Sequence, residues 1–163
     1  MDELFAELFG VDSNIAINFF VSGLEEMADT KSRDEMIYVA SILAHYAQTS
    51  RCDISSMPVL ANLSEVHDEF VLVQINDPEI LEIGGSQILL FAGFFRDQMS
   101  LRHNVNWFDS LGQSFYIRAS NGLREAKKRE LLEKMAESFP VWTLRCRDLH
   151  RYYRDSRYLI KPN

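Results

Sequence analysis

The chain has 163 residues, of which 47% are hydrophobic and 25% are charged. This composition predicts one globular domain and excludes a disordered chain. The longest apolar run, Ile88 to Phe95, has eight residues, whereas a membrane-spanning helix needs about 20, so we expect no membrane association.

Charge distribution and cysteine content further limit the kind of protein that the sequence can encode. Residues 1–117 contain 5 Lys/Arg and 18 Asp/Glu, so this region is acidic. Residues 118–163 contain 12 Lys/Arg and 6 Asp/Glu, so this region is basic. The two regions either complement each other within the fold or mark a partner surface. The acidic start, MDELFAELFG, is unlike a secretory signal, and Cys52 and Cys146 match no metal or redox spacing. We therefore expect a cytoplasmic protein with two buried thiols, and a disulfide is not implied.

The sequence first predicts two amphipathic helices, residues 13–30 and 32–51. Asp12 or Ser13 can cap the first, and Ser32 with Glu35 forms a capping-box pattern in the second. The apolar residues at helical spacing in the first helix are Ile17, Phe20, Val21, Leu24 and Met27. Those in the second helix are Met36, Val39, Ala40, Leu43 and Ala47.

The signals in the next stretch are weaker. A short helix is expected over 55–63, with Pro58 near its first turn. The segment 64–77 suits either a lone strand or a helix, and the helix is favoured because a lone strand would have no partner. Asp77 followed by Pro78 predicts the start of another helix, because aspartate caps helices and proline fits their first position.

The stretch GGSQILLFAGFF has neither the further glycines nor the Lys-Ser/Thr pair of a phosphate loop. We expect Gly84 and Gly85 to end the helix that starts at Pro78, and Ser86 to cap a new helix. This helix, residues 86–99, has no polar face in its apolar run, so it is predicted to lie buried at the centre of the fold.

Three more helices are predicted, residues 106–120, 123–139 and 141–159, the last begun by Pro140. Asn121 and Gly122 mark the break after the first of them. Its expected inner face consists of Trp107, Phe108, Leu111, Phe115 and Ala119. The inner face of the second consists of Leu131, Leu132, Met135 and Phe139.

These elements predict an all-α fold, a single-domain bundle of about seven helices over residues 1–163 with a buried central helix near 86–99. Residues 1–11 are expected to be a peripheral segment. Gly93 and Gly112 lie inside apolar helices, where glycine is about 1 kcal/mol less favourable than alanine. We expect their helices to be antiparallel neighbours, with another backbone close to at least one glycine.

The segments GGSQILLFAGFF and NWFDSLGQSFY resemble a pattern found in uncharacterised bacterial proteins. In that pattern a short apolar helix ends in Gly-Phe-Phe, and an aromatic pair, a glycine and a tyrosine follow about a dozen residues later. The matching residues are Gly93, Phe94, Phe95, Trp107, Phe108, Gly112 and Tyr116. YVASILAHYAQTS and ELLEKMAESFP also look similar, so the resemblance covers most of the chain. It implies a bacterial protein without an established activity, and Trp107 and Phe108 replace two expected tyrosines.

The sequence contains no recognisable catalytic or metal-binding motif. The four histidines, which form neither Glu-x-x-His nor His-Glu-x-x-His pairs, are His45, His67, His103 and His150. An improvised metal site of His45 and His67 with Glu65, Asp68 and Glu69 is less favoured than solvated or hydrogen-bonded side chains. Ser114 lies within a predicted helix rather than in a nucleophile elbow, so a small residue at a helix crossing is expected. We predict no metal and no cofactor.

Polar residues on the central helices suggest a small-ligand or enzyme site around Tyr116. Asp109 and Arg118 lie on the same predicted helix and would contribute charged groups. A tyrosine hydroxyl among aromatic residues can bind a ligand, but it more often has a buried partner within the fold.

The last helix suggests nucleic-acid binding as an alternative. Arg147, Arg151, Arg154 and Tyr158 recur at helical spacing, and arginine with aromatic residues can contact phosphates and stack on bases. Aspartates are interspersed, so the arginines can equally be surface ion pairs. The absence of a convergent catalytic set favours a non-enzymatic interaction or regulatory protein. Its partner would be another protein or a second copy, bound through the N-terminal stripe of Phe5, Leu8 and Phe9.

Overall fold

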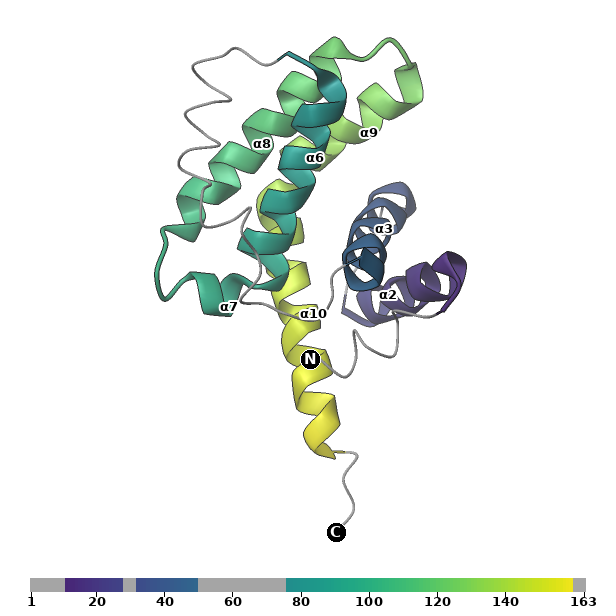
Figure 1. The fold of residues 1–163 in the computed structure, drawn as a ribbon, viewed down its shortest axis with the longest axis vertical. Helices are drawn as coiled ribbons and strands as arrows, with labels where there is room; N and C mark the ends of the chain where they lie inside the picture. Colours follow the sequence, from purple (N-terminus) through teal and green to yellow (C-terminus); the bar gives the residue numbers. More distant parts are fainter. Residues whose placement is uncertain (1–10, 28–31, 50–75, 160–163) are drawn as a thin grey trace.

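The protein is a single-domain all-α bundle with one hydrophobic core (Figure 1). The structure, a computed structural model, describes residues 11–27, 32–49 and 76–159, with 156–159 described as helix only. These residues form seven α-helices and one π-helix and no strand. The predicted fold class is therefore confirmed.

The first two helices follow the predicted pattern closely. They are α2, Ser13–Met27, and α3, Arg33–Thr49. Asp12 caps α2, since its carboxylate accepts from the Asn14 N–H at 2.8 Å. All five residues of the predicted stripe are buried in α3, whereas of the five predicted in α2 only Phe20 and Leu24 are fully buried.

The prediction that Gly84 and Gly85 end a helix is wrong. Asp77 caps α6, Pro78–Leu89, as expected, but α6 continues through both glycines and through Ser86. Both glycines are buried, and a Cβ atom built on Gly85 would lie 3.2 Å from the Tyr116 ring of α8. Gly85 therefore permits close helix packing instead of forming a left-handed cap.

The predicted central helix over 86–99 is divided into three parts. The end of α6 leads into the π-helix η2, Leu90–Phe94, and then into the short helix α7, Arg96–Met99. In η2 the Phe95 N–H donates to the Leu90 carbonyl at 3.0 Å, five residues back. Every residue from Ile88 to Phe95 is buried, so the predicted central location is confirmed.

Helix α8, Val105–Gly122, runs antiparallel to α6, as predicted. Phe91 packs edge-on against Phe108 at 4.9 Å between ring centroids, whereas Gly122, at the far end of α8, lies against Pro78. The predicted burial of Trp107 is wrong: its side chain is 41% exposed at the start of α8, against the edge of the Phe108 ring. The other predicted inner residues of α8 are buried.

The last two helices are α9, Ala126–Glu137, and α10, Phe139–Leu159, which extends along the molecule beside η2 and α2 (Figure 1). Helix α9 starts three residues later than predicted, and Leu131 is only half-buried. The α9–α10 junction is held by Glu35 of α3. Its carboxylate accepts from the Ser138 hydroxyl and from Trp142 Nε1, the latter at 3.2 Å.

Both interior glycines mark close contacts between helices. A Cβ atom built on Gly93 would lie 3.1 Å from the Cα atom of Thr143 in α10, so a neighbouring backbone approaches this glycine, as predicted. A Cβ atom on Gly112 would lie 2.1 Å from the ring of Phe139. These glycines therefore lower the intrinsic stability of their helices but allow neighbouring helices to pack closely.

Some predictions concern residues outside the described part of the chain. They are the stripe of Phe5, Leu8 and Phe9, the elements expected over 55–63 and 64–75, Cys52, and the proposed metal ligands near His67. Within the described residues, Cys146 is a buried free thiol. No described helix combines the length and the apolar character that crossing a membrane requires.

Candidate ligand-binding site

A chain of polar side chains runs from the core to the surface through Tyr38. The Tyr116 hydroxyl is 3.0 Å from Ser86 Oγ, which is 3.5 Å from the Tyr38 hydroxyl. Tyr38 donates to Glu82 Oε1 at 2.8 Å, and Lys128 Nζ lies 3.0 Å from the same oxygen. Side chains from α8, α6, α3 and α9 thus meet in one hydrogen-bonded chain.

Both tyrosines of this chain remain protonated at neutral pH. Burial raises the pKa of Tyr116 and of Tyr38 above the ordinary value of a phenol. The Glu82 carboxylate raises both pKa values further, because it disfavours a second negative charge nearby. These hydroxyls can therefore donate and accept hydrogen bonds, but they are poor general bases and poor nucleophiles.

An open pocket lies beside this polar chain, between α3 and α6. We call it the α3–α6 pocket; its volume is about 540 Å³, within the usual range for small-molecule sites. Its lining combines apolar side chains with hydrogen-bonding groups. The lining residues are Tyr38, Ser41, Ile42, His45, Tyr46, Thr49, Glu82, Ile83, Ser86, Gln87, Leu90 and Lys128.

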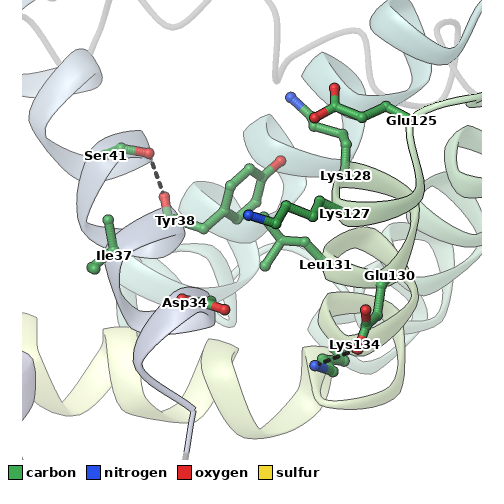
Figure 2. Close-up of a pocket in the computed structure, with 10 residues that line it drawn as sticks. All are labelled: Asp34, Ile37, Tyr38, Ser41, Glu125, Lys127, Lys128, Glu130, Leu131 and Lys134. Atoms are coloured by element: carbon green, nitrogen blue, oxygen red, sulfur yellow. Dashed lines mark hydrogen bonds and ion pairs between the residues drawn. The ribbon is translucent and has the colours of Figure 1, made fainter.

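A second pocket, of about 580 Å³, lies on the other side of Tyr38, between α3 and α9. Figure 2 shows Tyr38 projecting from α3 toward α9, where Leu131 and the lysines lie. The residues that line this α3–α9 pocket are Asp34, Ile37, Tyr38, Ser41, Glu125, Lys127, Lys128, Glu130, Leu131 and Lys134. Tyr38, Ser41 and Lys128 line both pockets. We refer to the two pockets together as the Tyr38 groove.

The charges that line the α3–α9 pocket are balanced. Three carboxylates and three ammonium groups face it, and Lys134 pairs with Glu130 at 2.9 Å (Figure 2). Lys128 pairs with Glu82 in the neighbouring pocket. The Tyr38 groove therefore has no strong field of one sign that would attract a polyanion or a polycation.

The residues predicted around Tyr116 do not share one pocket. Tyr116 is fully buried behind Ser86 and does not line the α3–α6 pocket itself. Asp109 lies about two turns earlier on α8 and forms a buried ion pair with Arg96 at 3.1 Å. Arg118 is half-buried and leaves α8 about 200° around the helix from Tyr116. Neither Asp109 nor Arg118 lines the Tyr38 groove.

The three arginines of the nucleic-acid hypothesis each pair with an aspartate. Arg147 binds Asp148 at 2.8 Å, and Arg154 binds Asp155 at 3.1 Å. Arg151 binds the carboxylate of Asp97 through two nitrogens, both at 2.7 Å.

The hydrogen bonds from Arg151 lower the pKa of Asp97, so this pair remains ionised at neutral pH. The side chain of Tyr158 lies outside the described residues. The arginines that are described therefore present a surface of alternating charge.

Metal ligation has no support in the described residues. No group of three or more histidine, cysteine or acidic side chains that could hold a metal ion occurs among them. His45 lines the α3–α6 pocket near its opening, and His150 is buried against the Phe94 ring at 4.8 Å between centroids. Burial also raises the pKa of the Cys146 thiol to about 12, so this thiol is inert at neutral pH.

The residues that build the Tyr38 groove were not predicted as a site. Tyr38, Glu82, Ser86 and Lys128 lie on three helices, and no local motif links them. One signal was available: Tyr38, Glu82 and Ser86 lie in predicted helices that also carry many apolar residues, and polar groups that become buried in such helices need partners. The sequence alone could not show which partners they would find.

Comparison with known proteins provides no further guide to function. The chain matches no protein-family model, no curated protein and no solved structure. The functional argument therefore rests on the geometry of the site.

Proposed function

We propose that this chain is a non-enzymatic, cytoplasmic interaction protein that binds a short, uncharged peptide segment of a partner protein in the Tyr38 groove. The observation that carries the proposal is the adjacency of the two pockets, which share the lining residues Tyr38, Ser41 and Lys128. One extended ligand that lies across these residues can contact α3, α6 and α9 together.

The chemistry of the lining supports a peptide as the occupant. Ile37, Ile42 and Ile83 offer apolar contacts for side chains, while hydroxyl, carboxylate and ammonium groups between them can bind main-chain amides. Because the groove carries four carboxylates and three ammonium groups, its charges nearly balance, and an uncharged segment adds no charge that would need a partner. The same balance, together with the paired arginines of α10, weighs against the alternative of nucleic-acid binding.

The polar chain supports binding rather than catalysis. Tyr38 and Tyr116 are held in the protonated form, and Glu82 is engaged by Lys128. No described side chain in the groove is thus poised as an activated nucleophile. The buried, unpaired thiol of Cys146 is compatible with a reducing compartment.

Peptide selection tests this function directly. A display library of 12-residue peptides is selected on the immobilised full chain, and the enriched peptides are measured by fluorescence anisotropy. We expect apolar, uncharged peptides that bind the wild type and lose at least about tenfold in affinity to Ile83→Asp, since a buried carboxylate has no partner there. Ile80→Asp is the matched control, because Ile80 lies on the same helix, is similarly exposed and does not line the groove.

Three results would contradict the proposal. They are the absence of enriched peptides, enrichment of strongly charged peptides, and peptides that bind Ile83→Asp as well as Ile80→Asp. Light scattering of the free protein distinguishes self-association. A dimer that Ile83→Asp dissociates would assign the groove to a second copy of the chain and overturn the proposal of a separate partner.

A further inference from the structure

Assigning an acceptor to each hydroxyl proton shows which donors and acceptors in the α3–α6 pocket are available to a ligand. Tyr116 is fully buried, its hydroxyl lies 3.0 Å from Ser86 Oγ, and Tyr38 is a second side-chain partner of this hydroxyl. A buried hydroxyl proton needs an acceptor, and Tyr38 already directs its own proton to Glu82, so Ser86 Oγ at 3.0 Å is well placed to take the proton of Tyr116. This assignment fixes the direction of the 3.0 Å hydrogen bond between them.

The proton of Ser86 has only a weak partner. Tyr38 uses its single hydroxyl proton on Glu82, because an ionised carboxylate accepts and does not donate. The oxygen of Tyr38 is 3.5 Å from Ser86 Oγ, at the limit of a hydrogen bond. The Ser86 hydroxyl can therefore turn toward a ligand in the pocket and donate to it.

Glu82 has an open acceptor next to this donor. Its contacts with Tyr38 and with Lys128 in the described part of the chain both involve Oε1, which leaves Oε2 able to accept. Ser86 lies four residues after Glu82 on α6, so the two side chains are neighbours on one helix face, and both line the pocket. A donor and an acceptor thus stand side by side in a pocket that Ile42, Ile83 and Leu90 also line.

We propose that the α3–α6 pocket recognises a carboxamide group. The amide oxygen accepts from the Ser86 hydroxyl, the amide N–H donates to Glu82 Oε2, and an attached alkyl group packs against Ile42, Ile83 and Leu90. A carboxylate in the same place would face the charge of Glu82. An ammonium group would compete with Lys128, which already neutralises Glu82.

This inference rests on the proposed function and names the chemistry that the groove recognises. A primary amide, as in an asparagine or glutamine side chain or a small metabolite, presents its oxygen and one N–H on the same edge and can make both bonds. A trans main-chain amide directs its oxygen and N–H in opposite directions, so it would make mainly one of the two bonds. A secondary amide has one N–H and a primary amide has two, so the two sources can be distinguished with simple compounds.

Three probes with two, one and no N–H donors test the proposal: hexanamide, N-methylhexanamide and N,N-dimethylhexanamide. Each is titrated into the ¹⁵N-labelled full chain while backbone amide resonances are followed by NMR. We expect shifts at α3 and α6 around the pocket, with Kd values of about millimolar for ligands of this size. The dimethyl compound should bind at least about tenfold more weakly, because a hydrogen bond to a charged group is lost.

The dimethyl compound could bind more weakly because it lacks an N–H donor or because its methyl groups are bulky, and a substitution distinguishes the two effects. In Glu82→Gln the preference for hexanamide over the dimethyl compound should fall to less than about threefold, since the charged acceptor is gone. Glu79→Gln is the control, because Glu79 is exposed on the same helix and does not line the pocket. Tighter binding of N-methylhexanamide than of hexanamide assigns the site to main-chain amides, and the reverse order assigns it to primary amides.

Equal binding of all three probes, a preference that persists in Glu82→Gln, or shifts confined to other helices would overturn the carboxamide proposal. The absence of any shift at saturating probe would do the same. If selected peptides still bind the groove and depend on Ile83, the proposed function survives and only the carboxamide assignment fails. If neither peptides nor amides bind, both fail.

Discussion

Replacing Gly112 with alanine sets helix propensity against packing, and the structure decides which effect is larger. Propensity alone favours alanine by about 1 kcal/mol in a helix interior. The new Cβ atom, however, would lie 2.1, 2.5 and 2.7 Å from three carbon atoms of the Phe139 ring. The Phe139 ring is fully buried, so it cannot swing into solvent to relieve these contacts.

The magnitude follows from these distances. Overpacking a well-packed core costs about 1–3 kcal/mol, and contacts this short with a whole ring place the substitution at about 3. After the gain in propensity is subtracted, Gly112→Ala should lower the free energy of unfolding by about 2 kcal/mol. Urea denaturation followed by circular dichroism measures this value, with an unchanged m-value as the sign that the unfolded state is unaffected.

Two controls isolate the contact. Ser114 is exposed on the same helix, so the difference between Ser114→Ala and Ser114→Gly measures propensity alone and should favour alanine by about 1 kcal/mol. Phe139→Leu removes the ring, and in that background Gly112→Ala should raise stability by about 1 kcal/mol through propensity alone, which gives a coupling energy of about 3 kcal/mol. Gly112→Ala as stable as the wild type would refute the argument, as would an equal loss in both backgrounds.

Three further predictions concern buried charged or titratable groups. Asp109→Ala should lower stability by about 3 kcal/mol in urea melts, because it leaves the nearly buried Arg96 guanidinium without its carboxylate. Burial lowers the pKa of His150, so the unfolded chain binds more protons than the native one. Stability should therefore decrease as the pH falls below about 6.5 through the folded pKa, and His150→Gln should remove this part of the pH profile. Burial would raise the pKa of Glu35, but hydrogen bonds from serine and tryptophan side chains lower it on balance. Glu35→Gln should cost about 1–3 kcal/mol at pH 7 and less in acid, as thermal melts from pH 7 to pH 3 can show.

The fold could be predicted wherever a local pattern determines it. Helical periodicity identified α3 and its buried stripe, and Asp77 with Pro78 marked the start of α6 because capping depends on a few adjacent residues. The same reasoning failed at Gly84 and Gly85. Glycine serves both helix ends and close helix contacts, and only the position of Tyr116 in α8 distinguishes the two.

The π-helix and the Glu35 contacts show a second limit. Nothing in the run from Leu90 to Phe94 distinguishes a five-residue hydrogen-bond spacing from a four-residue one. The helix that packs against this run at Gly93, α10, comes from a distant part of the sequence. The sequence predicts Glu35 as half of a capping box with Ser32, yet its carboxylate also accepts from Trp142, 107 residues away in the chain. Long-range partners of this kind leave no local signal.

The close packing of α6 on α8 and the chemistry of the Tyr38 groove have a common origin. Because Gly85 has no side chain, the Tyr116 ring can lie against the backbone of α6, one residue before Ser86. That position brings the buried Tyr116 hydroxyl within 3.0 Å of Ser86 Oγ and gives it a close hydrogen-bond partner. In the proposed site, Ser86 accepts a hydrogen bond from Tyr116 on the core side and directs its own proton toward the pocket. The buried tyrosine singled out by the sequence would thus act behind that site, where it positions the serine that lines the pocket, and the glycine before that serine makes the contact possible.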